Sequence, residues 1–219
     1  MDDNSENFRN TSRAEFAYRQ LLDAIHNKVF QQGDRIREEE IASNYGISRT
    51  PVRQALQRLQ TRGLLDYAPS RGLIVAELSR QQILELYAVR ELLEGAAARL
   101  AAQHAGPTDI AAMRSLLEDF RAAAPNPEKL ARINRMLHDA IYEAAHNRYL
   151  NQSLNDLSDT LALLKGTTFS VDMRWKSADA ENTLIVDAIA ARDADAAEKA
   201  ARAHIREAQK VRLRLLFQS

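Results

Sequence analysis

The stretch GISRTPVRQAL, residues 46–56, decides the fold of the N-terminal third of this 219-residue chain. Its glycine favours a tight turn, because a positive φ costs glycine little. Ser48 stands where a helix N-cap is expected, and Pro51 falls in the first turn, where its missing N–H does no harm. A short segment with apolar residues at helical spacing, residues 38–45, precedes the glycine. Helix, turn and second helix together predict a helix-turn-helix unit.

Segments on either side of this unit complete a small domain. Upstream, apolar residues recur at helical spacing from Ser12 to Val29 and predict a first helix. Downstream, two β-prone runs, residues 64–67 and 73–76, flank the turn sequence PSRG at 69–72 and predict a hairpin. The expected domain is therefore three helices followed by a two-stranded wing.

The chain after Leu78 is predicted to be helical throughout. Six segments carry apolar residues at helical spacing, and their bounds are 79–104, 108–123, 127–145, 149–164, about 172–191 and 194–217. The fold class is thus mainly α, with a winged helix-turn-helix followed by an all-helical bundle. We expect a disordered tail at residues 1–11, the winged domain at 12–78 and the helical domain at 79–219.

Composition excludes several classes of protein. Lys plus Arg and Asp plus Glu both total 30, so a wholly basic nucleic-acid coat protein and a polybasic membrane anchor are excluded. Without cysteine there is no disulfide framework, thiolate zinc site or cysteine nucleophile. The polar N-terminus lacks the apolar core of a secretory signal, and no stretch is long and apolar enough to span a membrane. We expect a soluble cytoplasmic protein without membrane partners.

Positive charge is concentrated in the predicted second helix and wing. Between residues 47 and 76 five arginines face a single aspartate, which leaves a local charge of +4. In a helix-turn-helix the first turn of the second helix meets base edges in the major groove. The side chains at that place are Ser48, Arg49, Thr50 and Arg53. The pattern therefore predicts binding to double-stranded DNA.

Each of these side chains has a chemical role to offer. Arg49 and Arg53 are four residues apart, so they share one helix face and can each donate two parallel hydrogen bonds to a guanine. Thr50 suits a phosphate or a thymine methyl group, and Arg71-Gly72 at the hairpin tip suits the DNA backbone or minor groove. The alternative is a purely structural unit with solvated arginines. Arginines near a helix N-terminus oppose the helix dipole, however, so stability alone does not favour them there.

The same residues resemble a known family. The stretch at 46–56, together with Leu59, Gly63-Leu64 and Pro69-Ser70-Arg71-Gly72, is similar to the GntR family of bacterial transcription regulators. The resemblance covers about residues 12–78. It implies a winged helix-turn-helix that binds a pseudo-palindromic operator as a homodimer, with Arg49, Thr50, Arg53 and Gly72 as DNA contacts.

Polar residues interrupt the apolar stripes of the helical domain. Arg90 lies in the middle of one stripe, and a buried guanidinium needs an anion, either Glu94 one turn away or the carboxylate of a ligand. Asn134 and His138 share a face of another helix, and Asn182 and His204 each lie on a further apolar face; such residues are often satisfied core polar groups. Because four helices each direct a polar group inward, a ligand site in the bundle core is the sharper interpretation.

The helical part also resembles a known domain. The segments around Arg90–Glu94, 134–141, Glu181-Asn182 and His204 resemble the FadR-type C-terminal (FCD) effector domain of the VanR-like kind. That resemblance implies a small organic acid as effector, above a metal held by Asn134, His138 and His204. The pattern departs at Asn182, where metal-binding members carry histidine, and two imidazoles with two amides are a weak first shell for one zinc or nickel ion. Whether the site holds a metal ion therefore stays open.

These observations lead to one function and leave an alternative. We expect a ligand-responsive DNA-binding transcription repressor that works as a dimer, with the effector in the helical domain. The alternative is an architectural or constitutive DNA-binding regulator without a small-molecule effector. An enzyme is not expected, because the chain has no Gly-rich phosphate loop, no HExxH and no Ser-His-Asp ordering.

Overall fold

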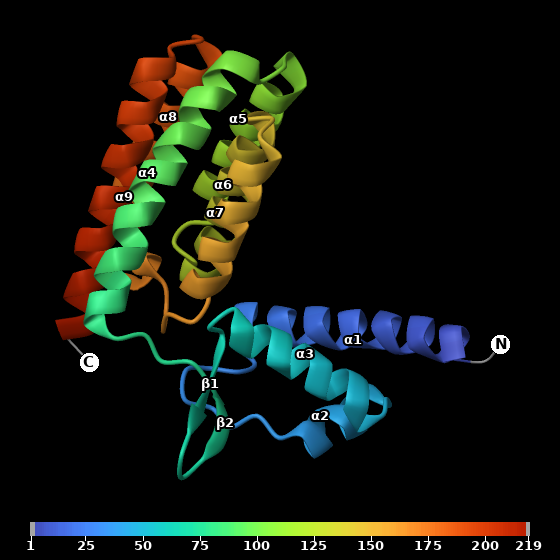
Figure 1. Ribbon diagram of the computed structural model, residues 1–219. Helices are drawn as coiled ribbons and strands as arrows, with labels where there is room; N and C mark the ends of the chain where they lie inside the picture. Colours follow the sequence, from blue (N-terminus) through green and yellow to red (C-terminus); the bar gives the residue numbers. More distant parts are fainter. Residues whose placement is uncertain (1–2, 218–219) are drawn as a thin grey trace. The chain divides into compact units, whose positions relative to one another are not determined.

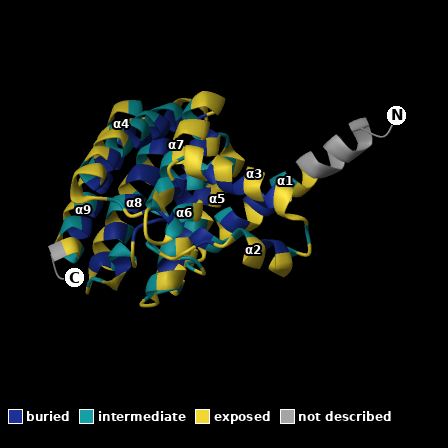
Figure 2. Ribbon diagram, turned by 60° about the horizontal axis from the view of Figure 1, so that its bottom comes forward, coloured by how far each residue is buried: buried dark blue, intermediate teal, exposed yellow. Residues whose placement is uncertain are grey.

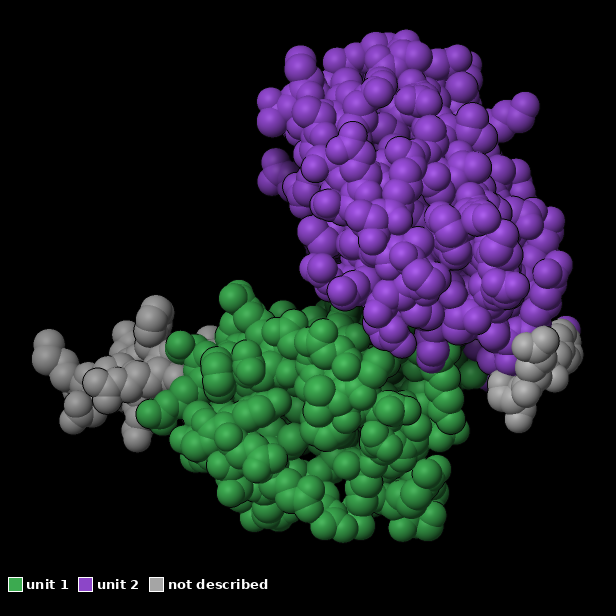
Figure 3. Space-filling model, turned by 180° about the vertical axis from the view of Figure 1, so that it is seen from behind, with its two compact units in different colours: residues 1–78, 158–165 green, residues 79–157, 166–219 purple. Residues whose placement is uncertain are grey.

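The computed structural model describes the backbone of residues 3–217 and the side chains of residues 12–216. Within that part the fold is mainly α with one two-stranded sheet, which confirms the predicted class (Figure 1). The chain divides into two compact units, residues 1–78 with 158–165 and residues 79–157 with 166–219 (Figure 3). The expected disordered tail, residues 1–11, lies outside the residues that are described in full, although helix α1 is assigned from Asp3.

The first unit has the expected order of elements. Its bounds are α1 (Asp3–His26), α2 (Glu38–Tyr45), α3 (Arg49–Thr61), β1 (Leu65–Ala68) and β2 (Gly72–Val75). Helix α1 ends three residues before the predicted Val29, and the strands lie one residue away from the predicted runs. The strands pair antiparallel, with Leu65 opposite Val75 and Ala68 opposite Gly72.

Two residues mark the turn between α2 and α3. Gly46 caps α2 in the left-handed conformation with φ of 63°, as its place in the turn predicted. Ser48 occupies the N-cap of α3 with extended backbone, but its hydroxyl makes no capping hydrogen bond. The apolar face of α3, with Val52 and Leu59 fully buried, then packs against α1 to form the core of the unit.

A short segment from far along the chain belongs to the first unit. Leu163 is 2% exposed and joins the core cluster of α1 and α3. Asp159 accepts from His26 Nε2 at 2.8 Å and from Arg62 Nη2 at 2.9 Å. The Nζ of Lys28 donates to the carbonyl of Leu164 at 2.8 Å. Residues 158–165 fall within the range predicted for the helical domain, 79–219, and their contacts group them with the winged unit.

The second unit is built from helices. They are α4 (Arg80–His104), α5 (Pro107–Ala122), α6 (Pro127–Ala144), the first part of α7 (Arg148–Leu161), α8 (Arg174–Ala190) and α9 (Ala194–Phe217), with a 3₁₀ turn at Thr168–Ser170. Predicted and observed bounds agree within three residues. Ser79 and Gln82 form a capping box that starts α4.

Small residues allow the helices of this unit to pack closely. Ala97 and Ala101 of α4 and Ala197 of α9 are 0% exposed, and α4 runs along α9 with α8 beside it. Figure 2 shows the buried residues gathered on the faces that these helices turn toward one another. A polar side chain on such a face is removed from water, so it needs a partner inside the bundle. Among residues 12–216, no helix is long and apolar enough to cross a membrane.

Candidate functional site

The first turn of α3 exposes the side chains that are predicted to contact DNA. Ser48, Arg49, Thr50 and Arg53 are all exposed, while the opposite face of the helix is buried in the core. This separation leaves the polar face of α3 open over its N-terminal turns. It is the arrangement in which a helix-turn-helix presents side chains to the major groove.

A carboxylate from outside residues 47–76, the segment with a local charge of +4, lies beside these arginines. Glu38, the first residue of α2, accepts from Arg49 Nε at 2.9 Å and from Arg53 Nε and Nη2 at 3.0 and 2.9 Å. Arg49 Nη2 also contacts Glu39 Oε1 at 2.9 Å. Hydrogen bonds from Arg53 and then Arg49 hold the pKa of the Glu38 carboxyl below its usual value, against the opposing effect of burial. The positive charge of Arg49 and Arg53 at the first turns of α3, which we call the cationic strip, is therefore partly neutralised at its centre.

The wing has the expected chemistry at its tip. Arg71 is exposed in the turn between β1 and β2, and its backbone N–H donates to the carbonyl of Ala68 at 3.0 Å. Gly72 has φ of 76°, a conformation that side-chain-bearing residues rarely adopt. The tip is thus small and cationic, as the sequence predicted.

In the second unit, Arg90 meets an anion supplied by the protein itself. Its Nε donates to Glu94 Oε1 at 2.5 Å, and the other oxygen of Glu94 accepts from His138 Nδ1 at 2.5 Å. All three side chains are buried or nearly so, with Glu94 3% exposed. The first of the two partners considered for Arg90, Glu94, is the one observed.

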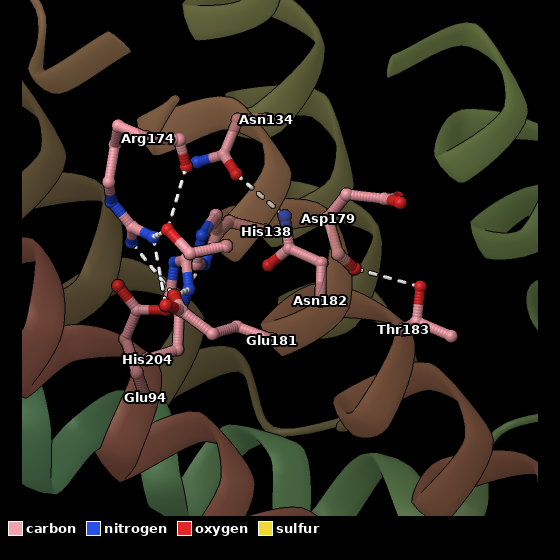
Figure 4. A network of polar contacts seen from close by, with 10 residues as sticks. Glu94, Asn134, His138, Arg174, Asp179, Glu181, Asn182, Thr183 and His204 are labelled. Carbon is pink, nitrogen blue, oxygen red and sulfur yellow. Dashed lines mark hydrogen bonds and ion pairs between the residues drawn. The ribbon is translucent and has the colours of Figure 1, made fainter. Parts of the chain in front are cut away.

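A second triad of the same kind lies beside the first. Arg174 donates through both terminal nitrogens to the carboxylate of Glu181, each at 2.8 Å, and His204 Nδ1 donates to Glu181 Oε2 at 2.7 Å (Figure 4). The rings of His138 and His204 are 5.2 Å apart, so the two Arg–Glu–His triads meet through their imidazoles.

The two asparagines complete the cluster. Asn182 Nδ2 donates to Asn134 Oδ1 at 2.9 Å, and Figure 4 shows this pair next to the imidazoles in the interior of the unit. The structure thus brings together Asn134, His138, Asn182 and His204, and links Arg90 to them through Glu94. We call these eight residues the bundle cluster: Arg90, Glu94, Asn134, His138, Arg174, Glu181, Asn182 and His204.

Two nitrogen atoms of the bundle cluster are buried without a hydrogen-bond partner. They are His138 Nε2 and Arg174 Nε. Because a carboxylate only accepts, the Nδ1 of a neutral His138 carries the proton and its Nε2 offers a lone pair. Arg174 Nε is a donor. The cluster therefore has one acceptor and one donor that a small molecule could satisfy.

Charge in the cluster is balanced by its own carboxylates. Burial acts to raise the pKa of Glu94, but the charge of Arg90 and the hydrogen bond from His138 outweigh it, so that pKa lies well below its usual value. Burial would lower the pKa of Arg90, and the charge of Glu94 raises it instead. Burial lowers the pKa of His204 to about 4, despite its hydrogen bond to Glu181. His204 is therefore neutral at physiological pH.

The side chains predicted to hold a zinc or nickel ion make hydrogen bonds within the bundle cluster. Among residues 12–216 no group of three or more His, Asp or Glu side chains is placed to hold a metal. Both imidazoles donate from Nδ1 to a glutamate, so Nε2 is the ring nitrogen left for a metal, and Asn134 Oδ1 already accepts from Asn182. Two imidazoles and an amide oxygen make a weak donor set for these ions.

Arg174 and Glu181 were not among the predicted site residues. They are seven residues apart on α8, two helical turns, so they share a face. Two oppositely charged side chains on one helix face, Arg174 and Glu181, are the sequence signal that could have identified them as site residues. The hydrogen bond between Glu181 and His204 of α9 joins this pair to the cluster.

Family comparison agrees with both units. Residues 13–75 match the model described as bacterial regulatory proteins, gntR family, and residues 85–207 match that of the FCD domain. The chain belongs to the GntR family, with an FCD domain. It is a DNA-binding transcriptional regulator, and the sequence resemblance is confirmed.

Relatives and solved structures support this membership. The HTH-type transcriptional regulator YdhC of Bacillus subtilis is 27% identical over 190 residues, 85% of either chain. The HTH-type transcriptional repressor GlaR of Escherichia coli is 28% identical and covers 86% of this chain and 90% of its own. The structure of E. coli McbR/YncC superposes with a TM-score of 0.78 at 24% identity over 94% of this chain and 97% of that one, a likeness of fold. GntR regulators bind operators, generally as dimers.

Proposed function

We propose that this GntR-family regulator is a ligand-responsive repressor. In this proposal it binds a pseudo-palindromic operator as a homodimer, and a small organic acid in the bundle cluster weakens that binding. The observation that carries the proposal is the buried pair of unpartnered nitrogens, His138 Nε2 and Arg174 Nε, in a cluster drawn from four helices. Most buried polar atoms in folded proteins have a hydrogen-bond partner, so an unpaired buried atom calls for one, such as a ligand, an ion or a water molecule.

An organic acid suits the chemistry of the cluster. A carboxylate oxygen would accept from Arg174 Nε, and a hydroxyl group or an acid proton would donate to His138 Nε2. The guanidinium groups of Arg90 and Arg174 are paired with Glu94 and Glu181, so a ligand carboxylate would compete with these glutamates for them. Such competition would rearrange α4, α8 and α9, which is the source of the coupling we propose between ligand and DNA.

Dimerisation follows from the size of the DNA-binding surface. One α3 helix with Arg49, Thr50 and Arg53 specifies too few base pairs to find an operator in a genome. Two copies on a pseudo-palindrome double the number of base contacts. Repression is the sign that we propose by analogy with GlaR, which is named as a repressor.

The proposal is tested with the full chain in three steps. An operator is first selected from a random DNA pool, and organic acids are then screened by thermal shift, because a ligand that binds only the native state raises Tm. The effect of each hit on operator affinity is measured for the wild type and for Arg174→Lys, which keeps the charge but removes Nε. The matched control is Arg114→Lys on the surface of α5.

We expect an acid that raises Tm and weakens operator binding in the wild type and the control, but not in Arg174→Lys. If no acid changes operator affinity although the operator is bound, the chain is a constitutive regulator and the effector part of the proposal is wrong. Because the donor set is weak, we also propose that no zinc or nickel ion is tightly held. Elemental analysis showing about one such ion per chain would contradict this.

A further inference from the structure

Glu38 lies between Arg49 and Arg53, the two arginines of α3 that we propose contact DNA. Its side chain is 19% exposed, whereas those of Arg49 and Arg53 are 56% and 67% exposed. The carboxylate is thus set back toward the protein, and the guanidinium groups extend outward from it. One side chain on α2 holds both of the proposed base-contacting residues of α3.

The hydrogen bonds use the same edge of each guanidinium group. Arg53 donates to Glu38 through Nε and Nη2, and Arg49 donates through Nε to Glu38 and through Nη2 to Glu39. Within residues 12–216, the Nη1 atom of neither arginine makes a hydrogen bond or ion pair. The edge formed by Nη1 and the second hydrogen of Nη2 is therefore open on both side chains, and it carries the two parallel donors that guanine O6 and N7 require.

Holding the arginines in this way reduces two obstacles to specific binding. A long arginine side chain loses rotamer freedom when it is fixed on a base, and part of that loss is already incurred in the free protein. Two positive charges one turn apart also repel each other, and the carboxylate between them relieves the repulsion. Both effects favour binding in one defined geometry.

The same carboxylate opposes binding that depends on charge alone. Non-specific affinity for DNA comes from cations near the phosphates, and a negative charge in the middle of the cationic strip weakens it. A residue that only stabilised the fold would change both kinds of binding together. Glu38 is placed to shift them in opposite directions.

We propose that Glu38 is a positioning residue that sets the operator specificity of this regulator. It aims Arg49 and Arg53 at guanines by their open edges and lowers the affinity for other DNA. The inference rests on the proposed role of the two arginines as base contacts.

The test compares Glu38→Gln, Glu38→Asp and Glu40→Gln in the full chain. Glu40→Gln is the matched control, because Glu40 lies on the same turn of α2 and pairs with Arg37 rather than with α3. Dissociation constants are measured for the selected operator and for a scrambled duplex of equal length, at several salt concentrations. Tm is measured for every variant to confirm folding.

We expect Glu38→Gln to lower the ratio of operator to scrambled affinity at least about fivefold, with scrambled DNA bound more tightly than by the wild type. Glu38→Asp, which keeps the charge, should restore part of the ratio, and Glu40→Gln should change both affinities by a similar factor. The proposal is overturned if Glu38→Gln behaves like Glu40→Gln, or if it binds the operator more tightly with an unchanged ratio. If the wild type itself does not discriminate between the duplexes, the proposed base contacts fail and not the role of Glu38 alone.

Discussion

Glu94 should be one of the most sensitive positions in the helical unit. Its carboxylate is 3% exposed and is the common acceptor of Arg90 and His138, which are 13% and 6% exposed. Glu94→Leu leaves a buried guanidinium without its anion, and breaking a buried pair in this way costs about 3–5 kcal/mol of unfolding free energy. Glu94→Gln keeps the shape and one acceptor oxygen, so we expect a smaller loss of about 2 kcal/mol. On the scale of 1.4 kcal/mol for a factor of ten, Glu94→Leu shifts the folding equilibrium by roughly a thousandfold.

Urea unfolding followed by far-UV circular dichroism measures these losses. The matched control is Glu85→Gln on the same helix, an exposed glutamate that accepts a hydrogen bond from Gln81, and it should change stability by less than about 0.5 kcal/mol. Adding Arg90→Met to Glu94→Leu should recover part of the loss, because the unpaired charge is then removed as well. If Glu94→Gln and Glu94→Leu both resemble Glu85→Gln, the carboxylate does not hold the cluster together and our account of it is refuted.

Three further outcomes follow from the described contacts. Arg53→Ala should weaken operator binding by roughly 5- to 150-fold in a mobility-shift titration, against little effect of Arg132→Ala; equal effects would exclude Arg53 as a base contact. Leu163→Ala should cost about 2–5 kcal/mol in urea unfolding because its side chain is buried in the first unit, whereas exposed Leu184→Ala should cost less than about 0.5 kcal/mol; the reverse order would contradict the assignment of Leu163 to that core. The pKa of His204 is lowered from 6.5 to about 4, so the folded state keeps this imidazole neutral at a pH where the unfolded chain takes up a proton. The free energy of unfolding should therefore fall as pH drops from 6.5 toward 4, by about 2 kcal/mol at pH 5. This loss should be smaller in His204→Gln, and a pH dependence unchanged by that substitution would count against the buried neutral imidazole.

Local signals were enough to predict the elements of this fold. Gly46 and Pro51 mark the turn and the start of α3, and the Gly106-Pro107 and Asn126-Pro127 steps mark helix starts in the second unit. The β hairpin was found from PSRG at 69–72, with a shift of one residue. Such signals act over a few residues, so a sequence carries them openly.

Contacts between side chains on different helices were harder to predict from the sequence than the helices themselves. Glu38 is 11 and 15 residues from Arg49 and Arg53, across a turn, and no periodicity links them. The polar residues of the helical unit were found because they interrupt apolar stripes, but the partner of His204 on a different helix could not be chosen from spacing. Relative rotation of packed helices decides such partners.

The segment at 158–165 has a consequence for building chimeric regulators. It lies within the part of the sequence that matches the FCD domain, yet its side chains complete the core and ion pairs of the winged unit. A chimera joined at Leu78 would receive this segment from the wrong parent and place a foreign residue where Leu163 and Asp159 belong. The winged unit of this chain is inherited as two separate pieces of sequence, and a working exchange of effector domains has to carry the second piece along with the first.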